Sequence, residues 1–351
     1  DHIVLTDGNY SSFSIRRSGT EKNPIVIRAA NGLGATISSQ VAIDADNIIL
    51  YGLQHTSRII IGENSRAANF RLWRCQIRNV SGIAVRTYNC PDPDFAYCQI
   101  GPEIQGRGFL VSYQNGTRRP VWRYCFFHDT PAGYGPKESG GNGECIHWGD
   151  NGAPDGFLDP MNGLMYRCKI KNWNADAEQP SIKCSGNTIR QCVLENCSLG
   201  LFNIRFGFNN TIEACWSKNS AGIGVRSGCN TGSNRHKILG NLIEGGGQIE
   251  LRAGNVQPCD TSNSPKPFFN AAGWTVVSGN TGTVRVGDTP SDPTRTPIPA
   301  QSVRIREHSG TINLNGDYQT DTDNQPNVAE TLYEWSSPIW LEDDDVGPFT
   351  G

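Results

Sequence analysis

The sequence lacks several features that would place it in a common functional class. Its 31 lysines and arginines are balanced by 34 acidic residues, and the formal net charge is −3. Generic nucleic-acid binding is not expected, because it usually comes with a strongly basic domain. No apolar run is long enough to span a bilayer. The sequence contains no CxxC motif and no clustered Cys/His spacing of the kind that binds zinc. It also contains no coiled-coil heptads that would support a trimeric spike.

Short apolar, β-branched runs punctuated by Asn and Gly are present along the chain, with no amphipathic helical segment between them. Examples are Asn187–Arg190, Asn210–Glu213 and His236–Leu239. Such strands are typical of all-β proteins, and 40 glycines and 20 prolines suit a chain that turns often. Basic residues that follow such runs recur at intervals of 22, 21 and 26 residues. This repeat is about half the length of a propeller blade, so the sequence predicts a parallel β-helix.

Two insertions and a tail interrupt this rhythm. Loops near residues 131–161 and 255–270 are rich in glycine or proline, and we expect the first to form a wall of a groove. The rhythm resumes afterwards, so we expect the β-helix to occupy residues 1–316. Residues 317–351 are acidic and irregular, which indicates a C-terminal strap or cap.

Half of the twelve cysteines occupy one position of the repeat. They lie in phrases such as Trp73-Arg74-Cys75-Gln76-Ile77, and Asn241 takes the same position in a later repeat. A small side chain recurring once per turn suits an inward-facing stack, and free cysteine behaves as a small hydrophobe. We therefore predict a buried thiol ladder of Cys75, Cys98, Cys125, Cys168, Cys192 and Cys215, whereas Cys229 and Cys259 are the candidates for a disulfide.

One position of the repeat carries a basic residue each time, after an aliphatic one. The series is Lys183, Arg205, Arg226 and Arg252, separated by 22, 21 and 26 residues, and His147 is aligned with it through Ile146-His147-Trp148-Gly149. Equivalent positions of successive turns lie about 4.8 Å apart. A line of like charge is costly unless an anion binds there, so the sequence predicts a surface for an extended polyanion.

Acidic and amide side chains precede Lys183. Asp176 and Glu178 alternate as in a strand and can point the same way, and Asn142 and Glu144 lie one coil earlier. One interpretation is charge balance for Lys183 and Arg205. The other is a calcium site, since Ca²⁺ takes carboxylate and amide oxygens.

These residues together resemble polysaccharide lyase family 6, which comprises alginate lyases and chondroitinase B. The resemblance is carried by Glu178-x₄-Lys183-x₃-Asn187-Thr188, by Arg205-x-Gly207-x₂-Asn210-Thr211 and by Asn142-Gly143-Glu144-Cys145-Ile146, and it covers about residues 1–255. It implies a right-handed parallel β-helix and β-elimination at a uronic acid, with Lys183 as base and Arg205 as acid. It also implies calcium held by Asn142, Asp176 and Glu178, with Glu144 as a further candidate.

The chain departs from the family pattern at three positions. Phe206 replaces the histidine of Arg-His-Gly, Asp176 replaces a glutamate, and His147 stands where an arginine is common. We expect Arg226 to clamp the substrate carboxylate, since its planar fork suits that group. Further substrate-binding candidates are His147 as a subsite contact or proton carrier, Arg252 at an outer subsite, and Trp148, Tyr134 and Phe206 as platforms for sugar rings, although Tyr134 and Trp148 equally suit loop packing.

The leading prediction is therefore a secreted or periplasmic lyase acting on an anionic polysaccharide, with alginate as the substrate. Dermatan or chondroitin sulfate is the alternative substrate. A phage-tailspike or adhesion module is the alternative class, and a hydrolytic one would need two carboxylates flanking the scissile bond. Asp176 and Glu178 could be proposed for that role. Oligomeric state leaves no periodic signal in the sequence.

Overall fold

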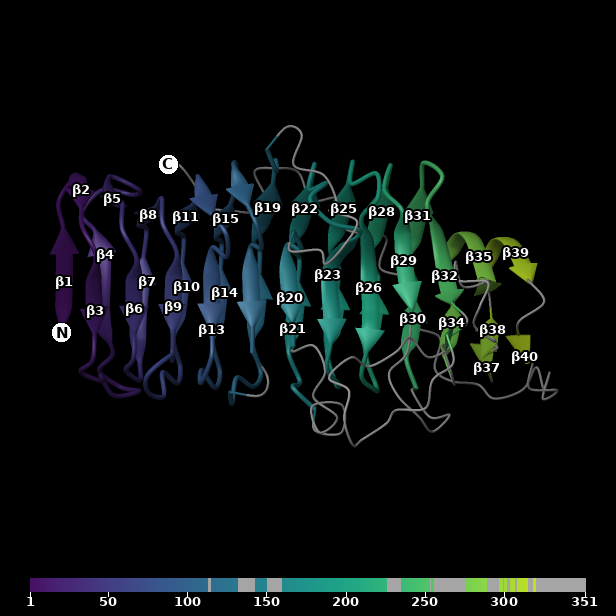
Figure 1. Ribbon diagram of the computed structural model, residues 1–351, viewed down its shortest axis with the longest axis horizontal. Coiled ribbons are helices and arrows are strands. Elements are labelled where there is room, and N and C mark those ends of the chain that lie inside the picture. Colours follow the sequence, from purple (N-terminus) through teal and green to yellow (C-terminus); the bar gives the residue numbers. More distant parts are fainter. Residues whose placement is uncertain are drawn as a thin grey trace.

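The computed structural model describes residues 1–112, 115–131, 143–149, 160–225, 235–252, 254–255 and 275–288, together with short segments between 297 and 319. Within these residues the chain contains strands and no helix. The strands stack into one elongated rod that begins with β1 at the N-terminus (Figure 1). The predicted all-β, right-handed parallel β-helix is confirmed. None of the described segments is a helix that could cross a membrane.

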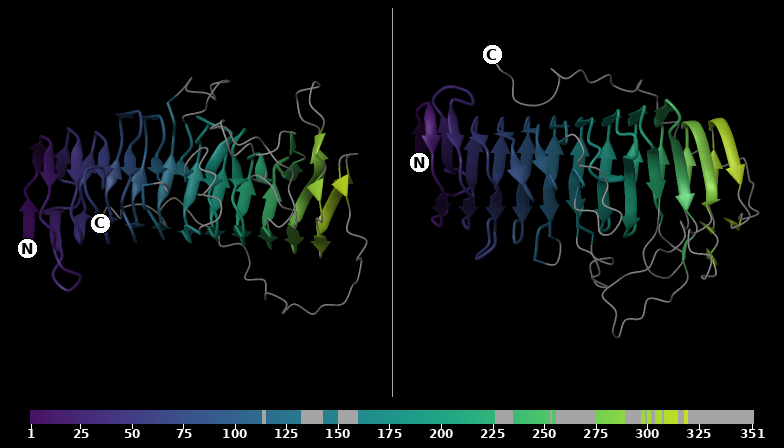
Figure 2. Two further views of the ribbon diagram at one scale, coloured as in Figure 1. Left: turned by 60° about the horizontal axis from the view of Figure 1, so that its bottom comes forward. Right: turned by 45° about the horizontal axis from the view of Figure 1, so that its top comes forward.

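Three long sheets, which we call first, second and third in the order in which the chain visits them, run along the rod, with twelve, ten and twelve strands among the described residues. Figure 2 shows the resulting stack from two further sides. The first sheet contains β1 (His2–Leu5), β4 (Ile25–Ala29), β7 (Ile48–Tyr51), β10 (Arg71–Trp73), β14 (Asp94–Ala96), β18 (Val121–Arg123), β21 (Leu164–Tyr166), β24 (Thr188–Arg190), β27 (Thr211–Glu213), β30 (Lys237–Leu239), β34 (Val276–Ser278) and β38 (Arg304–Arg306).

The second sheet contains β2 (Gly8–Tyr10), β5 (Ala35–Ile37), β8 (Gln54–His55), β11 (Gln76–Ile77), β15 (Gln99–Ile100), β19 (Phe126–His128), β22 (Lys169–Lys171), β25 (Val193–Glu195), β28 (Trp216–Lys218) and β31 (Leu242–Glu244). The third contains β3 (Phe13–Ile15), β6 (Val41–Ile43), β9 (Ile59–Ile61), β13 (Val85–Thr87), β17 (Phe109–Val111), β20 (Ile146–Trp148), β23 (Glu178–Lys183), β26 (Leu201–Phe206), β29 (Gly222–Val225), β32 (Gln248–Arg252), β35 (Thr281–Asp288) and β39 (Ser309–Leu314).

Three short pairs lie outside these sheets. They are β12 (Val80–Ser81) with β16 (Ile104–Gln105), β33 (Gly254–Asn255) with β36 (Pro297–Ile298), and β37 (Ala300–Gln301) with β40 (Tyr318–Gln319). Among the described strands, the pair of β33 and β36 is the antiparallel one. Most of the two predicted loop insertions, and most of residues 317–351, fall outside the described residues.

The interior is filled by side chains stacked in register. The first-sheet strands place one inward residue per coil, and those of four consecutive coils are Leu72, Phe95, Trp122 and Met165, all fully buried. Burying large apolar side chains is the main stabilising contribution to such a rod, and nearest-neighbour stacking spreads it along the axis.

The thiol ladder predicted from the repeat is confirmed. The six cysteines are buried and free, as are the other four cysteines of the described residues. The backbone N–H groups of Cys125, Cys168 and Cys192 each donate to the Sγ atom of the cysteine one coil further on, at 3.4 Å. Asn241 continues the ladder by accepting from the N–H of Cys215 at 2.9 Å. The proposed partners Cys229 and Cys259 lie outside the described residues.

The strand register confirms the aliphatic positions that precede the basic residues and corrects the alignment of the basic residues themselves. Ile182 pairs with Ile204, Ile204 with Val225, and Val225 with Leu251. The register shifts after Ile182, so Lys183 does not pair with Arg205. His147 pairs with Ser181, and Trp148 with Ile182, so the alignment of His147 with Lys183 was wrong by two residues.

Candidate active site

Lys183 and Arg205 project from neighbouring strands of the third sheet. Each follows a buried isoleucine of β23 or β26, so alternation along the strand turns both side chains outward. The register shifts after Ile182, so that Lys183 pairs with Phe206 and Arg205 is an extra residue on its strand. Such a bulge changes the direction of a side chain and is frequent at active sites.

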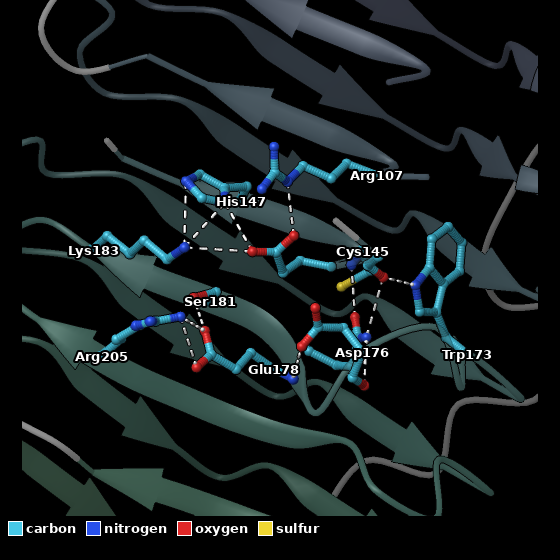
Figure 3. Close-up of polar contacts among 12 residues, drawn as sticks. Arg107, Cys145, His147, Trp173, Asp176, Glu178, Ser181, Lys183 and Arg205 are labelled. Carbon is cyan, nitrogen blue, oxygen red and sulfur yellow. Dashed lines mark hydrogen bonds and ion pairs between the residues drawn. The ribbon is translucent and has the colours of Figure 1, made fainter. Parts of the chain in front are cut away.

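The Lys183 amine lies in a buried, polar setting. Its Nζ atom is 3.1 Å from Nδ1 and 3.4 Å from Nε2 of His147, and 3.4 Å from Oε1 of Glu144 (Figure 3). Burial lowers the pKa of Lys183 to about 8, and the charges of Arg205 and Arg107 act in the same direction, whereas Glu144 and Glu178 oppose it. With this pKa roughly a tenth of the lysine is neutral at pH 7 and about half at pH 8, and the neutral form is the one that can accept a proton.

Glu144 joins three basic side chains. Its Oε2 atom accepts from Nε of Arg107 at 2.7 Å, and its Oε1 atom accepts from Nδ1 of His147 at 2.8 Å and from Lys183. Burial works to raise the pKa of Glu144, but these partners outweigh it and hold the pKa well below its usual range. Burial also lowers the pKa of His147 to about 4, so the imidazole is neutral at neutral pH, with Nε2 as an acceptor when Nδ1–H donates to Glu144.

Arg205 is held by a second carboxylate. Its Nη1 atom lies 3.1 Å from Oε1 and 3.2 Å from Oε2 of Glu178, and the Ser181 hydroxyl also donates to Oε2 of Glu178. The side chain of Arg205 is 28% exposed, whereas Glu178 is buried. The guanidinium is therefore fixed by Glu178 and still reaches the surface, where a ligand can meet it.

The carboxylates fit a calcium site only in part. Both oxygens of Glu144 accept from basic side chains, and both oxygens of Glu178 accept from Arg205, so Glu144 stays a further candidate ligand beside Glu178. Asp176 differs, since its Oδ1 atom accepts a backbone N–H from Glu178, and burial together with the charges of Glu144 and Glu178 raises its pKa to about 6. An accumulation of negative charge around Asp176 suits a hard cation. Asn142 lies outside the described residues, which contain no cluster of three His, Cys, Asp or Glu that could hold a metal.

Of the three aromatic candidates, the two among the described residues, Trp148 and Phe206, are buried. Trp148 is fully buried, packs edge-on against Trp122 at 4.8 Å between ring centroids, and donates from Nε1 to Sδ of Met161. Phe206 is 2% exposed and lies under the Arg205 guanidinium, 5.5 Å from the ring centroid. The expectation that these two rings stack on sugars is therefore wrong, because the register turns Trp148 into the core.

Three further candidates are not placed. Tyr134 and Arg226 lie outside the described residues, and of Arg252 the structure describes the backbone in β32 but not the side chain.

One residue of the site was not predicted from the sequence. Arg107 precedes β17 in a Gly106-Arg107-Gly108 stretch that carries no family motif, and only the coil-to-coil bond from the Gly108 N–H to the Glu144 carbonyl brings it to the site.

Comparison with known proteins finds similar structures but no match by sequence. No protein-family model matches the sequence, and no curated protein matches it. A mannuronic acid-specific polysaccharide family 6 lyase from human gut microbiota superposes with a TM-score of 0.68 at 16% identity, over 90% of this chain and 77% of the other. The fold is that of family 6 polysaccharide lyases.

Two other solved structures agree with this assignment of the fold. The family 6 lyase Pedsa3628 from Pseudopedobacter saltans gives a TM-score of 0.70 at 15% identity, over 99% of this chain and 95% of the other. A family 6 alginate lyase in complex with a trisaccharide gives a TM-score of 0.64 at 14% identity, over 90% of this chain and 77% of the other. Identities this low leave the reaction to be argued from the site itself.

Proposed function

We propose that the protein is a secreted or periplasmic lyase that cleaves a uronic-acid polysaccharide, with alginate as the first candidate, by β-elimination. The observation that carries the proposal is the pairing of Lys183, buried with a lowered pKa, with the partly exposed Arg205 on the next coil. The lyase fold and the oligosaccharide complex of a structural neighbour support it. Dermatan or chondroitin sulfate lyase activity is the alternative for the same residues.

In the proposed reaction, neutral Lys183 takes the proton from C5 of the uronate. The C5–H electrons move toward the carboxylate and then form the C4–C5 double bond, as the bond from C4 to the glycosidic oxygen breaks. Arg205 polarises the leaving oxygen, which receives its proton from water, since an arginine hardly gives up its own. Donors aimed at the developing negative charge stabilise it most where water is excluded, and the burial around Lys183 and Glu178 meets that condition.

Calcium remains part of the proposal, with Asp176, Glu178 and Asn142 as its ligands and Glu144 as a further candidate. When bound, it would neutralise the uronate carboxylate and so lower the cost of negative charge at C5. Glu178 would then hold the ion as well as Arg205, and His147, kept neutral, would contact the substrate or Lys183. Arg226 and Arg252 complete the proposed substrate contacts.

The proposed function is tested by the absorbance of unsaturated uronate at ultraviolet wavelengths. Polymannuronate, polyguluronate, dermatan sulfate and pectate are each incubated with the folded protein, with and without a chelator. A rise on one of the polymers supports β-elimination and identifies the substrate class. No rise on any of them would contradict a lyase of these substrates and favour the carbohydrate-binding or hydrolytic module.

Calcium affinity is expected to fall as the pH falls through about 6. The raised pKa of Asp176 means that its carboxylate takes up a proton near that pH, and a protonated carboxyl no longer binds the ion. The measurement is the rise in Tm caused by excess calcium at pH 5 and pH 7.5, in the wild type, in Asp176→Asn and in the surface control Asp92→Asn. Equal calcium effects in the wild type and Asp176→Asn would contradict the site.

The acidic limb of the activity profile is expected near pH 8. Because the pKa of Lys183 is lowered to about 8, kcat/KM should rise with pH below that value and level off above it. Glu144 raises the pKa of Lys183 through its charge, so Glu144→Gln should move the limb to lower pH. A limb that stays in place or moves upward in Glu144→Gln would show that Lys183 is not the group that titrates.

A further inference from the structure

A surface outside the active site carries tyrosines and arginines on consecutive coils. It lies along the corner between the first and second sheets, where Arg74, Tyr97, Tyr124 and Arg167 each follow a first-sheet strand. All four have positive φ angles, between 48° and 55°. We call these residues, together with Trp73, Arg123, Tyr166 and Arg190 at the ends of the adjoining strands, the corner strip.

The strip is a regular ladder. The N–H groups of Arg74, Tyr97, Tyr124 and Arg167 each donate to a carbonyl of the next coil, namely those of Ala96, Arg123, Tyr166 and Arg190. Consecutive members are therefore one strand spacing apart, about 4.8 Å. The strands involved, β10 to β24, occupy the blue-to-teal middle of the stack in Figure 1.

The side chains place cationic groups against flat rings. The rings of Tyr97 and Tyr124 are stacked, 4.8 Å apart with 2° between their planes. The guanidinium of Arg74 lies 5.1 Å from the centroid of the Tyr97 ring, and that of Arg167 lies 5.3 Å from the Tyr166 ring. These contacts hold long side chains in place, which reduces the entropy that a ligand must remove on binding.

The strip is accessible and carries four arginines. The side chains of Arg123 and Arg190 are 36% and 46% exposed, and Arg74, Tyr97, Tyr124 and Arg167 are of intermediate exposure. Arg123 pairs with Asp94 and Arg190 with Glu213, and Nε of Arg167 donates to Oε1 of Gln191 at 3.2 Å. Such a density of arginines on neighbouring coils suits an anionic ligand.

The strip is separate from the active site. Lys183 and Arg205 belong to the third sheet, whereas every member of the strip belongs to the first sheet or to the corner that follows it. A polymer in contact with the strip therefore meets the rod along another side of the coil from the one that carries Lys183.

We propose that the corner strip is a second binding surface for an anionic polysaccharide, which holds the polymer outside the active site. The planar fork of arginine suits carboxylates, and flat aromatic faces offer apolar area to the C–H faces of sugar rings. Repetition over successive coils suits a repeating polymer, because weak contacts add up when they are linked. The choice of a uronate polymer as the occupant rests on the proposed function.

The test compares polymer and oligomer in matched variants. Arg74→Gln/Arg167→Gln removes two charges from the strip, and Arg66→Gln/Arg119→Gln removes two from exposed arginines elsewhere, 57% and 58% exposed. Binding of long polymannuronate is measured by affinity electrophoresis in a Lys183→Ala background, and turnover of a short oligomannuronate is measured in the active protein. We expect the strip variant to bind the polymer at least tenfold more weakly, with unchanged oligomer turnover, and the control to bind as before.

Several results would overturn the proposal. One is that the strip variant binds the polymer as tightly as its parent. Another is that the control variant loses as much polymer affinity as the strip variant, which would indicate that positive charge anywhere on the surface has the same effect. Binding of a single-stranded oligonucleotide at the strip as tightly as the polymer would make it a nucleic-acid surface instead. If Arg74→Gln/Arg167→Gln lowers the Tm, Arg123→Gln/Arg190→Gln, which removes two charges from more exposed members of the strip, replaces it with the same expectation. Failure of the lyase proposal is distinct, because it appears as no ultraviolet signal from the wild type.

Discussion

Lys183→Ala should abolish β-elimination. General-base catalysis contributes about 10²–10⁴-fold, and Lys183 is the one described side chain that combines a buried amine, a lowered pKa and a place beside Arg205. We expect kcat to fall by about 10³-fold or more, measured by the ultraviolet signal, with little change in polymer binding. Lys183→Arg should be nearly as inactive, because it keeps the charge but is never neutral in this pH range.

The matched control for this experiment is Lys218→Ala. Lys218 is a partly exposed lysine of the second sheet that pairs with Glu195 at 3.5 Å, so its loss should leave kcat unchanged. Substantial cleavage by Lys183→Ala would contradict the proposed base. If such cleavage produced no unsaturated ends, it would instead favour hydrolysis by a pair of carboxylates, for which Asp176 and Glu178 are the available candidates.

Gly207→Ala should have the largest effect on stability and should remove activity with it. Gly207 has a φ of +90°, and an added Cβ atom would lie 2.2 Å from the Cys184 carbonyl oxygen and 2.4 Å from its carbon. Those atoms belong to the backbone of the preceding coil, next to Lys183, so the overlap is relieved only by separating the two coils that carry Lys183 and Arg205. We expect the free energy of unfolding to fall by more than about 4 kcal/mol, which is at the extreme of single substitutions. The Tm should fall with it.

Gly82→Ala separates the strain of the backbone angle from the overlap. Gly82 has nearly the same φ, +92°, but no atom within 4 Å of an added Cβ. It should therefore show only the cost of a left-handed conformation, about 1–2 kcal/mol, and retain lyase activity. Similar drops in Tm for the two variants would show that coil packing at Gly207 is looser than the structure indicates.

The sequence predicted the architecture because the repeat is visible in one dimension. Cys168 and its equivalents recur once per coil because an inward corner position accepts only a small side chain, and that requirement repeats with the fold. The placement of Lys183 and Arg205 after equivalent isoleucines on neighbouring coils followed from the same regularity, whereas the bulge that separates their register did not.

The errors arose where the rhythm is broken. His147 and Trp148 lie within the first insertion, so their register could not be counted from neighbouring repeats, and a shift of two residues changed which strand position each one occupies. Arg107 and Glu144 show a second limit. Their contact joins residues 37 positions apart, and no local pattern distinguishes an arginine that meets a carboxylate on the next coil from one that faces solvent. Glu144 was identified, and its contact with Lys183 agrees with the charge-balance interpretation, but Arg107 and His147 were not foreseen as its partners.

The division of the reactive pair between two coils has a consequence for heat inactivation. A rod held together by contacts between neighbouring coils can lose its ends before its middle, and Lys183 and Arg205 lie well inside the described stack, with β29, β32, β35 and β39 beyond them. Fraying that begins at the C-terminal end must pass those strands before it reaches Arg205. Cleavage should therefore persist while part of the strand signal in circular dichroism has already been lost on warming, and it should then vanish abruptly when the two coils part.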